Sequence, residues 1–199
     1  FYVTPPRKTY AICEFGFSER MLKPLWMGAD FEALPYEKKP VLRALIRKKY
    51  GIPIDANVMV LAGKLDAKKR PAELAEAFCR LDRRDWWLMY VGSMDPDIRT
   101  QVEQAAGETA RLVFTGFLSG AEVLEHIAAS DLAVFPGAHS VLWEQTVCLG
   151  VPAVFYEEVE GDASHLSNGN ALFLHRGDAR EILDCLNRLC FNESMLVRM

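Results

Sequence analysis

From Asn57 onward, short apolar runs alternate with helical patterns, and this alternation constrains the fold more than any other feature of the chain. The run at residues 58–62 is continuously apolar and ends at Gly63, as expected for a strand buried on both faces. Pro71 then stands at a favourable first helical position, with apolar residues at helical spacing behind it. Repetition of this unit predicts an α/β fold with a parallel, doubly wound sheet.

Further strands are predicted at residues 87–91, 111–114, 132–135, 152–156 and 171–174. Helices are predicted from residue 95 to about 106 and from about 141 to 149. Ser119 with Glu122, and Asp178 with Glu181, mark two more helix starts. Residues 1–56 are rich in proline, and we interpret them as an irregular connector with one short helix at 41–50. Residues 57–199 form the predicted domain.

Composition limits the class of protein. Half of the residues are hydrophobic and a quarter are charged, which is typical of a globular chain rather than a disordered or membrane-embedded one. The net charge of −4 gives no reason to expect nucleic acid as a partner. The five cysteines lack CxxC spacing, so we expect free thiols in a reducing compartment and a cytoplasmic location. Because the chain does not begin with Met, we expect it to be part of a longer protein.

Basic residues follow the first predicted strand, where ligands of doubly wound sheets bind. Lys64 and Lys69 are two cations beside a strand-to-helix turn, an arrangement that suits a pyrophosphate. The alternative is a solvated basic loop. The turn lacks the glycines of a P-loop and of the GxGxxG dinucleotide fingerprint, which disfavours nicotinamide enzymes.

The stretch Gly63-Lys64-Leu65, followed by Lys69, resembles the "GRL…K" signature of family 4 retaining glycosyltransferases. In that family an Arg and a Lys at these places hold the diphosphate of the sugar donor. Lys64 keeps the charge of the usual Arg but lacks its planar fork. Other family-like stretches occur in the family's order, one before this signature at residues 28–31 and the others after it at residues 90–92, 113–118, 129–136, 150–154 and 168–172.

The resemblance implies one Rossmann-like half of a two-domain GT-B fold, with its active site in the cleft between the halves. Residues 57–199 would bind a UDP-, GDP- or ADP-sugar, without a metal or other cofactor. Residues 1–56 would be the connector and the remnant of a missing N-terminal acceptor domain. We expect this chain alone to bind donor but to transfer sugar poorly, and a peripheral membrane contact through that domain stays open. Polysaccharide biosynthesis is the expected process.

The donor site departs from the family pattern in one place. The family has two Glu residues eight apart, and counting back from Gly150 puts the second at Gln145 and the first at Gly137. The neighbouring Glu144 lies about 100° from Gln145 around the helix, so only one of them faces the ligand. We slightly favour Glu144 for the ribose hydroxyls because a carboxylate accepts more strongly, whereas the family count favours Gln145.

Other candidate residues flank this helix. His139 and Ser140 lie in the preceding loop, where they could donate to the diphosphate or the sugar, and the first turn of the helix adds backbone N–H groups. The loop with Phe117 and Leu118 would lie against the base, although Phe117 is equally well a strand-end core residue. Two other functions stay open: a non-catalytic binding or scaffold domain, and a Rossmann-like sugar-nucleotide epimerase.

Overall fold

A parallel sheet of six strands in the order β3-β2-β1-β4-β5-β6 forms the centre of the molecule. The computed structural model describes residues 1–25, 28–109, 111–157, 163, 166 and 168–199. The strands are β1 (Asn57–Ala62), β2 (Trp86–Val91), β3 (Leu112–Phe114), β4 (Leu132–Phe135), β5 (Ala153–Tyr156) and β6 (Ala171–Leu174). Each lies within one residue of its predicted bounds, and the predicted α/β doubly wound class is confirmed.

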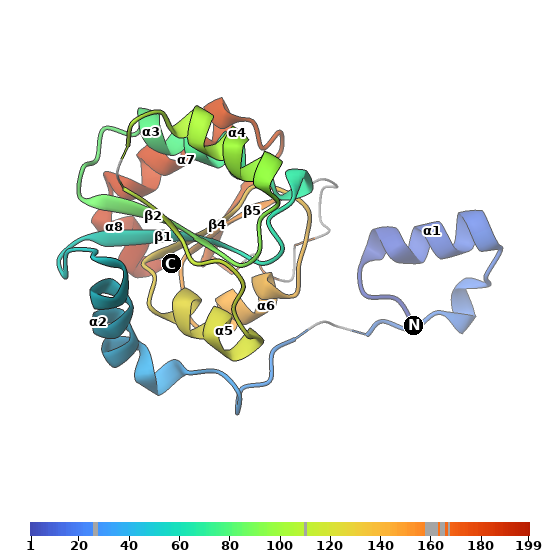
Figure 1. The fold of residues 1–199 in the computed structure, drawn as a ribbon. Helices are drawn as coiled ribbons and strands as arrows, with labels where there is room; N and C mark the ends of the chain where they lie inside the picture. Colours follow the sequence, from blue (N-terminus) through green and yellow to red (C-terminus); the bar gives the residue numbers. More distant parts are fainter. Residues whose placement is uncertain (26–27, 110, 158–162, 164–165, 167) are drawn as a thin grey trace.

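Helices cover both faces of this sheet (Figure 1). One face carries α3 (Pro71–Arg80), α4 (Pro96–Ala106) and α7 (Ala179–Cys190), and α8 (Glu193–Arg198) follows α7. The other face carries α2 (Lys39–Tyr50), α5 (Gly120–Ala128) and α6 (Leu142–Cys148). Both predicted capping residues are present, since the side chains of Ser119 and Asp178 accept from the N–H groups of Glu122 and Glu181. Asp95 stands at the N-cap of α4, but its side chain makes no capping hydrogen bond.

The prediction that the N-terminal segment is irregular apart from one helix is wrong. Residues Pro5–Phe15 form α1, which has no buried residue and lies apart from the helices on the sheet (Figure 1). Pro5 and Pro6 occupy the first helical positions, where a missing N–H costs nothing, and Gly16 ends the helix in a left-handed conformation at φ 66°. The prolines therefore begin a helix here instead of excluding one.

Helix α2 is part of the packed domain, although it precedes the boundary that we place at residue 56. Leu42 and Ile46 belong to the hydrophobic core, and the helix packs against α5. The boundary itself stays a prediction. The packing shows that the core of the domain extends N-terminal of β1.

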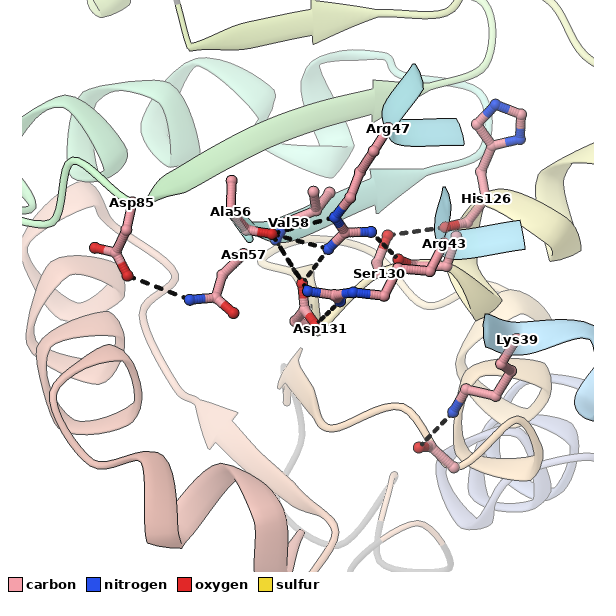
Figure 2. Close-up of polar contacts among 12 residues, drawn as sticks. Lys39, Arg43, Arg47, Ala56, Asn57, Val58, Asp85, His126, Ser130 and Asp131 are labelled. Atoms are coloured by element: carbon pink, nitrogen blue, oxygen red, sulfur yellow. Dashed lines mark hydrogen bonds and ion pairs between the residues drawn. The ribbon is translucent and has the colours of Figure 1, made fainter. Parts of the chain in front are cut away.

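A buried arginine ties α2 to the amino ends of two strands (Figure 2). The Arg47 side chain is 1% exposed and donates to the carbonyl oxygens of Ala56, which precedes β1, and Ala129, which precedes β4. It also donates to the Asp131 carboxylate at 2.7 Å, and that carboxylate accepts from Arg43 and from the Val58 N–H. Together these interactions join α2 to the amino ends of β1 and β4, the two strands between which the chain reverses its direction across the sheet.

The first turn of α2 makes a second long-range contact. The Lys39 ammonium donates to the carbonyl oxygens of Leu149 at 3.0 Å and Gly150 at 3.2 Å, just beyond the C-terminal end of α6. A cation suits this end of a helix because its last carbonyls carry partial negative charge. Burial lowers the pKa of Lys39, and Asp131 opposes that effect.

Candidate functional site

The turns that follow β1 and β4 meet at the carboxyl edge of the sheet. The chain enters α3 on one face after β1 and α6 on the other after β4, so these two turns lie at the switch point of the sheet, where doubly wound folds bind their ligands. The Ala138 N–H donates to the Lys68 carbonyl at 2.9 Å. At Gly137 a Cβ atom would lie 2.1 Å from that same oxygen, so only glycine permits this approach.

Lys69 crosses from one turn to the other. Its ammonium donates to the carbonyl oxygens of Ala138 and of His139, the latter at 3.1 Å. Burial lowers the pKa of Lys69, and the nearby Asp66 opposes that effect. Lys69 is therefore no solvated loop residue, whereas Lys64 is exposed at the start of the same turn.

In the loop after β4, the backbone carbonyls and the backbone N–H groups face opposite sides. Its carbonyls at Ala138 and His139 point to Lys69, so the N–H groups of His139 and Ser140, which share those trans peptide planes, point away. In the described part of the chain these two N–H groups have no protein acceptor. The Ser140 hydroxyl accepts from the Leu142 N–H at 3.3 Å and so shapes the entry into α6.

His139 and Glu144 form a pair at the start of α6. His139 Nε2 lies 3.0 Å from the Glu144 carboxylate, and the His139 ring meets the Trp143 ring edge-on at 4.6 Å. Glu144 is 3% exposed, while the Gln145 side chain on the next helical position is half-buried. The geometry thus directs Glu144 toward His139. Which of Glu144 and Gln145 meets the ribose stays a prediction.

The predicted base-binding loop is open to solvent. Phe117 is 83% exposed beyond β3, so the alternative that it is a strand-end core residue is wrong. Leu118 is half-buried and packs against the core. An exposed aromatic ring of this kind is available to stack on a planar ligand.

Arg70 is a residue at this edge that the sequence did not point to. It adopts a left-handed conformation at φ 53°, and its guanidinium donates to the carbonyls of Pro136 and Arg176 while lying 4.2 Å from the Tyr156 ring centre. The basic run at residues 68–70 was the only signal available. Arg70 fixes the turn after β1 against the ends of β4 and β6.

Other acidic and histidine residues lie elsewhere or outside the described chain. Glu158, Glu160, Asp162 and His165 fall on residues that the structure does not describe. His126 is buried between α2 and α5, where Nε2 lies 3.1 Å from the Tyr50 hydroxyl. Among the described residues, no helix is long and apolar enough to cross a bilayer, and no group of three or more His, Cys, Asp or Glu side chains forms a metal site.

Comparison with known proteins identifies the family to which the chain belongs. A family model described as "Glycosyl transferases group 1" matches residues 43–199, most of the chain. The chain belongs to this glycosyltransferase family. Within it, a curated relative is the 2-deoxystreptamine glucosyltransferase of Streptomyces kanamyceticus, 26% identical over 163 residues, which are 77% of this chain and 41% of that protein.

Solved glycosyltransferase structures share the fold. A glycosyltransferase from Rickettsia africae superposes with a TM-score of 0.85 at 12% identity, and HepE of Anabaena in complex with UDP and glucose does so with 0.81 at 18% identity. Each comparison covers 98% of this chain and 54% of the other. The GT-B type of fold predicted from the sequence is confirmed, and the chain spans about half the length of these relatives.

Proposed function

We propose that this glycosyltransferase chain binds a nucleoside-diphosphate sugar at the switch point formed by the turns after β1 and β4. The observation that carries the proposal is Lys69, a half-buried cation that bridges the two turns. An ammonium has three N–H donors, and two carbonyls occupy two of them, so one is left for a phosphate oxygen. Lys64, exposed on the same turn, adds a second positive charge.

The same groups support transfer chemistry. When the glycosyl bond breaks, negative charge grows on the diphosphate, and fixed cations stabilise that charge more than they stabilise the bound substrate. The N–H groups of His139 and Ser140 add donors on the other side of the loop. Lysines and backbone then take the place of a metal. We propose retention of configuration on the resemblance to family 4, with an acceptor bound by the remainder of a two-domain enzyme in the cytoplasm.

The ligands of similar solved structures bear on which nucleotide the donor carries. HepE of Anabaena is described in complex with UDP and with UDP-glucose, and this supports a UDP-sugar ahead of GDP- or ADP-sugars here. Phe117, exposed beyond β3, is placed to flank the base.

Calorimetric titration with UDP, GDP and ADP tests the proposal. We expect one nucleotide to bind, and Lys69→Ala and Lys64→Ala each to weaken it about tenfold or more, because each removes a charge-assisted hydrogen bond. Lys48→Ala is the matched control, since it removes an exposed cation next to Arg47, at the amino ends of the strands. If no nucleotide binds at millimolar concentration, the donor-site proposal fails and a non-catalytic scaffold domain takes its place.

A further inference from the structure

The ring of His139, in the loop after β4, contacts two buried residues. Its backbone carbonyl accepts from Lys69, its ring meets the edge of Trp143, and its Nε2 lies 3.0 Å from Glu144. Trp143 is itself 2% exposed and stacks on Phe155 with ring centres 4.6 Å apart. The contacts with Glu144 and Trp143, both buried, orient the imidazole.

The contact with Glu144 also determines the chemistry of the ring. When the Glu144 carboxylate is ionised it only accepts hydrogen bonds, and the Nε2 atom that faces it then carries a proton. In a neutral imidazole the other nitrogen, Nδ1, then holds a lone pair and can only accept. Within the described residues Nδ1 makes no hydrogen bond, and 29% of the His139 side chain is exposed.

We propose that Glu144 is a positioning residue for the donor substrate and acts through His139. It fixes the Nε2-protonated form of the ring, and Nδ1 accepts a hydrogen bond from a hydroxyl group of the bound sugar nucleotide. This inference rests on the proposed function. It replaces a direct role of Glu144 on the ribose, because that carboxylate is 3% exposed and turned toward His139.

The first arm of the test needs no ligand. Nitrogen NMR of the four histidine rings distinguishes the two neutral forms, and His139→Gln identifies the His139 signals. We expect the Nε2-protonated form in the parent chain. In Glu144→Gln, an amide of nearly the same shape can donate as well as accept, so we expect a mixture of the two forms. An unchanged His139 spectrum in Glu144→Gln would overturn the proposal.

The second arm measures affinity for UDP-glucose and UDP. His139→Gln keeps a donor toward Glu144 but lacks an acceptor at the place of Nδ1, whereas His139→Asn keeps an acceptor there. We expect Glu144→Gln and His139→Gln each to weaken UDP-glucose binding about fivefold to tenfold, and His139→Asn to restore part of the loss. Glu76→Gln, which neutralises an exposed carboxylate on α3, is the control for charge.

A double substitution separates this role from a merely structural one. If Glu144 acts through His139, adding Glu144→Gln to His139→Gln costs nothing further, because coupled residues are non-additive. Additive losses would show that Glu144 contacts the ligand or acts on stability, and would reject the proposal. The parent chain could bind neither UDP-glucose nor UDP while the ring spectra respond as expected. The proposed function would then have failed, although the pairing of His139 with Glu144 would stand. The role of Glu144 in positioning a donor would fail together with the proposed function.

Discussion

Arg47 and Asp131 form an ion pair at 2.7 Å in which the guanidinium is 1% exposed and the carboxylate 23% exposed. The pair connects α2 with the amino ends of β1 and β4 (Figure 2). The candidate donor site lies at the carboxyl ends of the same strands. Removing one member of such a pair leaves the other charge buried without compensation.

Asp131→Asn should therefore destabilise the fold by about 3 kcal/mol. Urea unfolding measures this as a lower transition midpoint at an unchanged slope. Glu76→Gln breaks the exposed pair with Arg80 and should cost less than about 1 kcal/mol. Equal midpoints for Asp131→Asn and the parent chain would show that the Arg47 contacts to carbonyl oxygens suffice.

His126 makes stability depend on pH. Burial lowers the pKa of its ring, and the hydrogen bond to the Glu122 carbonyl opposes that effect. The folded-state pKa thus lies below the unfolded value of about 6.5, so the neutral ring contributes stability above that pH. The free energy of unfolding should fall as the pH drops from about 6.5 through the folded pKa. His126→Gln should flatten this part of the profile, and a profile identical to that of the parent chain would refute the assignment.

How far the sequence predicts this structure depends on whether a feature is local. The residues of β4 and the capping box at Ser119 are encoded within a few neighbours and were predicted correctly. Helix α1 was missed because Pro5 and Pro6 start a helix as readily as they interrupt one. At the site, the position of Glu144 was predicted, but its direction depends on how the loop after β4 sets the rotation of α6, and no local pattern carries that information.

Lys69 should make nucleotide binding sensitive to alkaline pH. Its pKa is lowered by burial, so it loses its proton at a lower pH than an ordinary lysine, and affinity for the diphosphate should decline earlier as the pH rises. Calorimetry between pH 7 and 10 measures this. Lys69→Arg keeps its positive charge over this whole pH range. Whatever its absolute affinity, its nucleotide binding should therefore change less with pH than that of the parent chain. Parallel profiles would exclude Lys69 as a phosphate ligand.

Gly137→Ala should damage the site through the backbone. The added methyl would lie 2.1 Å from the Lys68 carbonyl oxygen, so the two turns would have to move apart. We expect a loss of about 1–3 kcal/mol in stability together with weaker nucleotide binding. Gly120→Ala, at an open position on α5, is the matched control and should leave both unchanged or slightly improve stability. Full nucleotide affinity in Gly137→Ala would place the ligand elsewhere.

Phe117→Ala should separate binding from folding. The ring is 83% exposed, so its removal should leave the unfolding midpoint within error of the parent value. If the base stacks on it, nucleotide affinity should fall by about 1–3 kcal/mol, the usual range for stacking on an aromatic side chain. Phe31→Ala removes another exposed ring, 72% exposed on the connector, and serves as control. Equal affinities would remove Phe117 from the site.

Lys39 on α2 holds the C-terminal end of α6. It binds the carbonyls at one end of that helix, while Glu144 and its contact to His139 lie near the other end. A helix of this length is about 10 Å long. Its two ends are therefore held by residues far apart in the sequence, Lys39 on α2 at one end and His139 in the loop after β4 at the other.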